Sequence, residues 1–269
     1  MKQMETRRMC PHCRAFITTS DRVCPYCNEK VGERAVDRRS PSPILGGMIP
    51  HAQFFTVIIL LLNVGIFIAS YLNSSLFDAG AKFGPYIRMG QWWRLVTAGF
   101  FHGGLLHIGM NSWVLFDVGA QVEQLYGASR MLVIYFVATV CGFYLSMLWS
   151  PLAPSVGASA AIMGLIGALI ALTLHHRTGM AAAMRGFYIR WVVYILIMGL
   201  LPGLQIDNAA HVGGLAGGFA VAYLAGTPKL VESSWQERVW KTAAYTSIVL
   251  TAFAFFQMYR WFTRGAQGL

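Results

Sequence analysis

The chain has 269 residues, of which 56% are hydrophobic and only 12% are charged. A soluble domain has about 25% charged residues, so the composition argues against an ordinary soluble protein and favours one that spans a membrane. The formal net charge of +10 fits membrane topology and some attraction to anionic lipid. It gives no reason to expect nucleic acid as a partner.

Four cysteines near the N-terminus form two CxxC pairs, Cys10 with Cys13 and Cys24 with Cys27. Two such pairs suit a tetrahedral zinc ion. Disulfides are the alternative, but a cytosolic location would disfavour them. Few apolar residues surround the cysteines, so the metal would have to stabilise the fold, and four ligands leave no open position for catalysis. We expect a structural zinc ribbon over residues 1–31, which could bind an unknown cytosolic partner.

Residues 32–50 combine Gly, Pro, Ser and charged residues, which predicts a flexible linker. Seven apolar blocks follow, each near the ~20 residues that a helix needs to cross the hydrocarbon core. The blocks lie at about 52–72, 104–124, 130–149, 157–175, 187–204, 208–226 and 242–262. The predicted fold class is therefore an all-α polytopic membrane protein with seven transmembrane helices and a small N-terminal zinc ribbon held by four cysteines.

Lys and Arg residues indicate the orientation, because cytoplasmic loops retain positive charge. Many of them precede the first block, whereas the loops after the third and fifth blocks carry none; Lys82, Arg88 and Arg94 in the long loop 73–103 are the main exceptions. We expect a cytoplasmic N-terminus and an outer C-terminus. The polar N-terminus shows no cleavable signal peptide, and the short loops favour a bacterial inner membrane.

In this orientation, three blocks begin at the outer face, and polar residues lie near each beginning. These residues are His102, His107 and Asn111, then Ser159, then His211. Polar groups at membrane depth are costly and usually functional. His107 and Asn111 share one helix face and could donate hydrogen bonds to an oxyanion. Ser159 could act as a nucleophile and His211 as its base, which predicts hydrolysis of peptide bonds within the membrane.

Each of these residues also has a structural interpretation. A serine in a Gly/Ala-rich helix often serves packing, a histidine near a helix start often lies at the interface, and His107 with Asn111 could form an interhelical pair. Asp207 is placed to cap a helix rather than to complete a triad. Asp117 and Glu123 are expected to pair with loop or neighbouring-helix groups.

Taken together, these motifs resemble the rhomboid family of intramembrane serine proteases over residues 91–223. The motifs in chain order are Trp93-Arg94, His102-x4-His107-x3-Asn111, Gly119-x3-Glu123-x3-Gly127, Gly157-x-Ser159 and Ala210-His211-x2-Gly214-x3-Gly218. Each motif alone is weak, but their order together with the fitting topology is specific.

The resemblance implies a Ser159–His211 dyad that needs no carboxylate. It implies an oxyanion hole formed by His107, Asn111 and the Ser159 backbone N–H, with His102 as a further support.

Beyond the chemistry, the resemblance implies that Gly157, Gly214 and Gly218 allow close helix packing at the site. It implies a six-helix core over 51–226, with 227–269 as an added seventh transmembrane helix. Family substrates are single-pass membrane proteins cut near the outer end of their transmembrane segment, and the fifth helix with its capping loop would form the entry gate.

Two residues depart from the family pattern. Ala160 stands where the family usually has Gly after the serine, and Met163 stands where an aromatic residue commonly stacks on the histidine. These departures motivate an alternative, a catalytically inactive rhomboid-like protein that binds transmembrane clients. A transporter or channel is a further alternative, but no inverted repeat is apparent.

Overall fold

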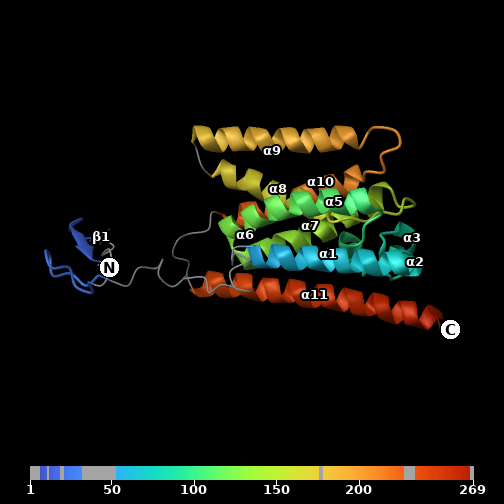
Figure 1. Cartoon of the computed structure of the whole chain (residues 1–269), viewed down its shortest axis with the longest axis horizontal. Helices are drawn as coiled ribbons and strands as arrows, with labels where there is room; N and C mark the ends of the chain where they lie inside the picture. Colours follow the sequence, from blue (N-terminus) through green and yellow to red (C-terminus); the bar gives the residue numbers. More distant parts are fainter. Residues whose placement is uncertain are drawn as a thin grey trace, which may run out of the picture.

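The computed structural model describes residues 7–10, 12–18, 21–31, 53–175, 178–226 and 234–266 (Figure 1). The predicted linker over 32–50 lies outside these residues. The N-terminal part forms two short antiparallel strands, β1 (Arg7–Met9) and β2 (Phe16–Thr18). The remaining elements are helical: α1 (Phe54–Leu72), α2 (Ser74–Gly80), α3 (Gly84–Arg88), α4 (Arg94–Thr97), η4 (Ala98–Phe100), α5 (Leu105–Val114), η5 (Leu115–Gly119), α6 (Ala120–Tyr126), α7 (Ala128–Trp149), α8 (Ser159–Leu174), α9 (Gly179–Met198), α10 (Asn208–Ala225) and α11 (Ser234–Ala266).

The chain is an integral membrane protein built mainly of helices, as the composition predicts. Among the described residues, α1, α7, α9 and α11 are long and apolar enough to cross a bilayer. The α8 helix is apolar but shorter, and α10 is rich in glycine. The count of seven transmembrane helices stays a prediction.

The predicted bounds of the fifth block, 187–204, are wrong, because α9 extends from Gly179 to Met198. It begins earlier because the Thr178 hydroxyl caps its first turn, accepting a backbone N–H bond at 3.2 Å. It ends earlier because Pro202 disfavours helix in the preceding residue and Gly203 adopts a left-handed φ of +88°.

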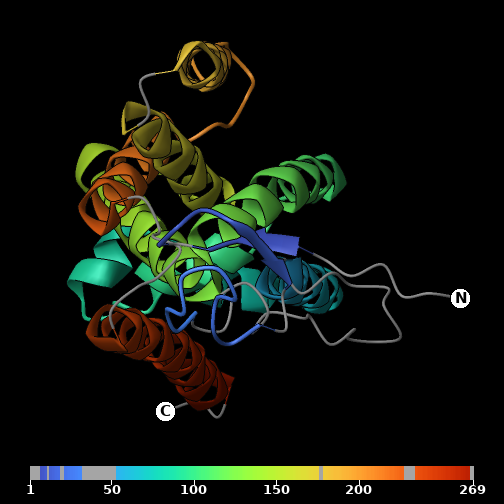
Figure 2. The ribbon, with the colours of Figure 1, turned by 90° about the vertical axis from the view of Figure 1, so that its left-hand side faces the viewer.

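The centre of the molecule is formed by α7, α8 and α10, which pack directly on one another. Most residues of α8 are buried, whereas α9 packs mainly on α8 and is largely exposed. Figures 1 and 2 both show α9 at one edge of the bundle and α11 at the opposite edge. Ser159 is the first residue of α8, the largely buried central helix.

Glu123 fixes the beginning of α1 against the second helical segment. Its carboxylate accepts bonds from the Phe55 N–H at 3.0 Å, the Thr56 N–H at 2.9 Å and the Thr56 hydroxyl at 2.7 Å. These donors are the first N–H groups of α1, which have no partner inside their own helix. The carboxylate thus has a structural role, as its position predicted.

The long loop after α1 is held against the loop that leads into α8. The backbones of Lys82 and Ser155 exchange two hydrogen bonds of 2.9 and 3.1 Å, and the Gly84 N–H donates to the Pro151 carbonyl at 2.9 Å. Arg94 is buried and donates to the Asp78 and Ala81 carbonyls, both at 2.6 Å. These contacts make the loop a rigid support beside the start of α8.

Candidate active site

Ser159 is the first residue of α8 and follows a tight turn. Gly157 has a φ of +129°, a backbone conformation that favours glycine. Its N–H donates to the Ala98 carbonyl at 2.9 Å, which ties the turn to η4. Ser159 therefore lies at the positive end of a helix dipole, where unpaired N–H groups favour developing negative charge.

His211 lies in the first turn of α10 and is 5% exposed. Asp207 caps this turn, because its carboxylate accepts the Ala210 N–H at 2.9 Å and also the hydroxyl of Ser146 from α7. This confirms Asp207 as a cap. Among the described residues, His211 Nδ1 has no hydrogen-bond partner.

The starts of α8 and α10 approach closely because glycine lies at their contact. A methyl group on Gly214 would lie 2.0 Å from the Ala160 carbonyl oxygen, and one on Gly218 would lie 2.3 Å from Gly164 Cα. Gly142 of α7 adds a third surface, since a methyl group there would lie 2.7 Å from both the Ala160 Cβ and the Ala210 oxygen. Ala160, which follows Ser159, and Ala210, which precedes His211, thus lie at the same contact between the helices.

His107 lies on the other side of the turn before Ser159. A methyl group on Gly157 would be 2.7 Å from His107 Nε2 and 3.6 Å from Ser159 Oγ, so both side chains border this glycine. His107 Nδ1 accepts the Gly103 N–H at 3.3 Å. A neutral imidazole that accepts through Nδ1 carries its proton on Nε2, so we infer an N–H donor next to Ser159.

His102 and Asn111 differ in their contacts with the residues around Ser159. His102 is 2% exposed, its ring centre lies 5.2 Å from that of His107, and its Nε2 accepts the Ala158 N–H at 3.5 Å. Asn111 instead donates to the His107 carbonyl within α5 at 2.9 Å. The structure therefore brings His102 to the turn before Ser159, while one Asn111 N–H is used inside its own helix.

Known proteins match this part of the chain. The sequence model of the Rhomboid domain family matches residues 89–228, about half of the chain. The chain belongs to the rhomboid family. The matched range agrees with the resemblance found over 91–223, and the rhomboid domain contains every element of the cluster described above.

Rhomboid relatives cover this chain only in part. Rhomboid protease GluP of Bacillus subtilis (strain 168) is 36% identical over 188 residues, 65% of this chain and 35% of that protein. RHOMBOID-like protein 7 of Arabidopsis thaliana is 37% identical over 162 residues, 56% of this chain and 49% of that protein. Inactive RHOMBOID-like protein 8 of the same plant is 32% identical over 124 residues, 45% of this chain and 35% of that protein. The chain thus spans between a third and a half of the length of these relatives.

Lys82 is a buried residue that the motifs of the sequence do not connect with the site. It is 0% exposed, and its Nζ donates to the Ser150 carbonyl at 3.0 Å and the Ala153 carbonyl at 2.8 Å. Burial lowers the pKa of Lys82, and the Asp207 carboxylate opposes this shift. The available signal was a lysine in a loop predicted to lie at the outer face, where positive charge is disfavoured.

Outside the rhomboid domain, the four N-terminal cysteines form a compact cluster. All four sulfur atoms lie within 4.8 Å of one another, and none is in a disulfide. The separations are 3.8 Å for Cys10–Cys27 and 3.6 Å for Cys13–Cys24. A tetrahedron with Zn–S bonds of ~2.3 Å has S–S edges of about 3.8 Å. The cluster can therefore hold a metal ion.

The two CxxC turns of this cluster are equivalent. The Arg14 N–H donates to the Cys10 carbonyl and the Asn28 N–H to the Cys24 carbonyl, both at 2.9 Å. Arg14 and Asn28 have left-handed φ values of 62° and 56°. The left-handed residue after each CxxC turn lets the chain reverse, so that both sulfur atoms of the pair lie in the cluster.

Proposed function

We propose that this rhomboid-family chain is an intramembrane serine endopeptidase with Ser159 as nucleophile and His211 as base. The carrying observation is the close contact of the starts of α8 and α10, where Gly214 leaves room for the Ala160 carbonyl. A nucleophile and a base must come within hydrogen-bond reach of each other. Glycine contacts of this kind are how membrane helices approach closely.

The proposed reaction has two halves. Ser159 Oγ attacks the carbonyl carbon of the substrate, and a ring nitrogen of His211 takes the hydroxyl proton. The same imidazolium then gives that proton to the leaving amine as the C–N bond breaks. Water attacks the acyl-enzyme in the second half, with His211 again as base, and releases the new carboxyl terminus and the free serine. Asp207 keeps its capping role, in line with a dyad that needs no carboxylate.

Negative charge that develops on the substrate oxygen needs donors. The inferred Nε2–H of His107 and the N–H of Ser159 at the start of α8 are the candidates that the geometry favours most. His102 supports them by its contact with the Ala158 N–H. Asn111 has a second side-chain N–H that can join when substrate binds. One such donor contributes ~2.7–4 kcal/mol to the transition state.

The departures at Ala160 and Met163 remain compatible with this chemistry. The Ala160 Cβ is 2.7 Å from the position of a methyl group on Gly142, so the missing side chain of Gly142 makes room for it. Met163 is 1% exposed and lies in the apolar core. Neither side chain removes a nucleophile, a base or a donor.

The remaining features of the proposal follow from topology and composition. We infer a cytoplasmic N-terminus, an outer C-terminus and a bacterial inner membrane. Substrates are single-pass membrane proteins, cut near their outer end after entry past α9, which packs mainly on α8. The segment 1–31 would hold a structural zinc ion through its four cysteines, 32–50 would link it to the core 51–226, and 227–269 would add the last helix.

The test is cleavage of a reporter with one transmembrane helix in liposomes. The wild-type chain should cut the reporter near its outer end, and Ser159→Ala should abolish the cut. Ser155→Ala is the matched control, because Ser155 lies in the loop before α8 and its bonds to Lys82 are made by the backbone alone. Cleavage that persists in Ser159→Ala would exclude the serine mechanism.

A fluorophosphonate probe separates the proposal from client binding without cleavage. Labelling of Ser159 in the wild type requires an activated hydroxyl, and it should disappear in His211→Ala. If the wild-type protein neither cuts the reporter nor reacts with the probe, the binding function is the better description. The inactive plant relative makes this outcome worth testing.

A further inference from the structure

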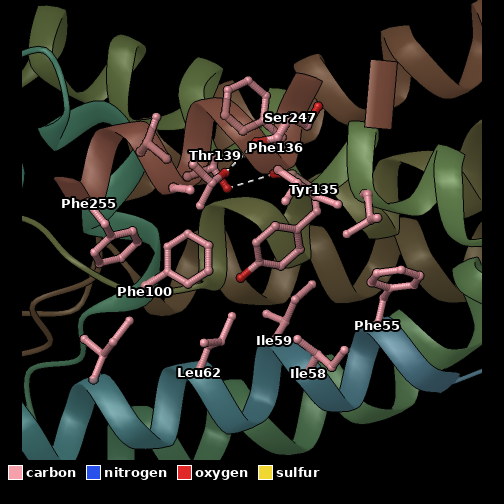
Figure 3. Close-up of a pocket in the computed structure, with 16 residues that line it drawn as sticks. Phe55, Ile58, Ile59, Leu62, Phe100, Tyr135, Phe136, Thr139, Ser247 and Phe255 are labelled. Carbon is pink, nitrogen blue, oxygen red and sulfur yellow. Dashed lines mark hydrogen bonds between the residues drawn. The ribbon is translucent and has the colours of Figure 1, made fainter. Parts of the chain in front are cut away.

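A cavity of about 450 Å³ lies on the side of the bundle away from α9. Its walls come from α1, α7 and α11, together with Val96 of α4 and Phe100 of η4. Figure 3 shows the apolar side chains of α1 facing those of α7 and α11 across this space, among them Ile59, Leu62 and Phe136. All three wall helices are long and apolar enough to cross a bilayer. The cavity therefore lies at the depth of the hydrocarbon chains.

The polar atoms around the cavity are mostly used inside their own helices. The Thr139 hydroxyl donates to the Tyr135 carbonyl at 2.8 Å, and the Thr251 hydroxyl donates to the Ser247 carbonyl at 2.8 Å. The buried Tyr135 hydroxyl and the Asn63 side-chain oxygen each have no hydrogen-bond partner among the described residues, and the two side chains are neighbours. Apart from this hydroxyl, the cavity offers an occupant a surface that is almost wholly apolar.

We propose that this cavity binds one hydrocarbon chain of a membrane lipid. The helices that line the cavity also carry exposed apolar faces, where Leu61 of α1 is 66% exposed and Val249 of α11 is 64% exposed, so lipid surrounds the walls of the cavity. An apolar cavity of about 150 Å³ holds one six-carbon benzene ring, so this cavity, about three times as large, suits a hydrocarbon chain of about eighteen carbons. A helix is ~10 Å wide and rises ~5.4 Å per turn, so only about one turn of a substrate helix would fit.

The bound chain would support the site through η4. Phe100 packs edge-on against Phe255 of α11, with ring centres 5.4 Å apart, and both rings line the cavity. Two residues before Phe100, the Ala98 carbonyl accepts the Gly157 N–H that fixes the turn before Ser159. An empty cavity would leave this end of η4 with fewer packing partners. Lipid occupancy and the position of Ser159 are therefore linked by a short path.

Photo-crosslinking tests the proposal on the full chain in liposomes that contain a phospholipid with a diazirine in its acyl chain. Label should concentrate on the cavity-lining peptides of α1, α7 and α11. Thr251→Phe and Ile58→Trp fill the cavity from α11 and α1 and should each lower that label about tenfold. Val249→Phe and Leu61→Trp, on the exposed faces of the same helices, should leave it unchanged.

Two results would overturn the proposal. One is label spread evenly over the exposed faces of α1, α9 and α11, which would mean ordinary boundary lipid. The other is loss of the label when the transmembrane reporter is added, which would mean a substrate site. The two filling variants lie on different helices, so a folding failure of one leaves the other to decide. Crosslinking needs no catalysis, so its result is independent of whether the chain cuts peptides.

Discussion

Gly214→Ala is the sharpest test of why α8 and α10 must touch. The new methyl group would lie 2.0 Å from the Ala160 carbonyl oxygen, where ordinary contact begins at 3.4 Å. The helices would have to separate by about 1.4 Å at this turn. A misplacement of ~1 Å at a catalytic site can lower activity ~100-fold. We expect kcat/KM for the reporter to fall by about that factor, because His211 moves away from Ser159.

The stability of the same variant should change much less than its activity. Overpacking costs ~1–3 kcal/mol, while replacing glycine by alanine inside a helix returns ~0.5–1 kcal/mol. Thermal unfolding in detergent, measured beside kcat/KM, separates the two effects. Gly65→Ala in α1 is the control, since nothing lies within 4 Å of its new methyl group. Wild-type activity in Gly214→Ala would refute the inference that close approach of these helices sets the dyad.

Three further results are expected from the other polar groups. Asp207→Ala should destabilise α10 by ~1 kcal/mol through the lost cap, and it should lower kcat in reporter cleavage. An unchanged kcat would exclude a role of Asp207 in positioning His211. Burial lowers the pKa of Lys82 below 10.5, so the unfolded state keeps the lysine proton to higher pH than the folded state does. The free energy of unfolding of the wild type should therefore rise with pH, relative to that of Lys82→Met, up to about pH 10.5. Parallel pH profiles of unfolding for the two proteins would contradict this. Elemental analysis of the wild type should find ~1 zinc per chain, and Cys27→Ser should lose it while reporter cleavage stays unaffected. Bound zinc equal to that of the wild type would contradict the assignment of four cysteine ligands.

The helical architecture was largely predictable because apolar length is a direct consequence of bilayer thickness. The bounds of α9 were not, because the apolar run Leu200-Leu201 continues past the end of the helix and only the backbone of Pro202 and Gly203 ends it. The segment from α5 to α6 was predicted as one helix, and the structure adds a π-helical turn at Leu115–Gly119. Such a turn depends on packing against neighbours rather than on composition.

The candidate site was predictable where topology alone brings residues to one depth. His102, His107, Ser159 and His211 all lie near helix starts, and the distribution of Lys and Arg predicts that these starts share one face of the membrane. Lys82 was missed because its role depends on backbone carbonyls of a distant loop, at 2.8 and 3.0 Å from its Nζ. A sequence pattern contains no record of which carbonyls a long loop will approach.

Two buried polar side chains of this bundle differ in how many of their hydrogen bonds are made. Glu123 accepts three bonds and serves the fold alone. His211 is as deeply buried, yet its Nδ1 has no partner among the described residues. A buried polar atom without a partner costs about 1–3 kcal/mol, so the free Nδ1 of His211 is kept at a cost in stability. We infer that this cost is retained because the imidazole must gain and lose a proton during the proposed reaction, which a fully bonded ring would resist.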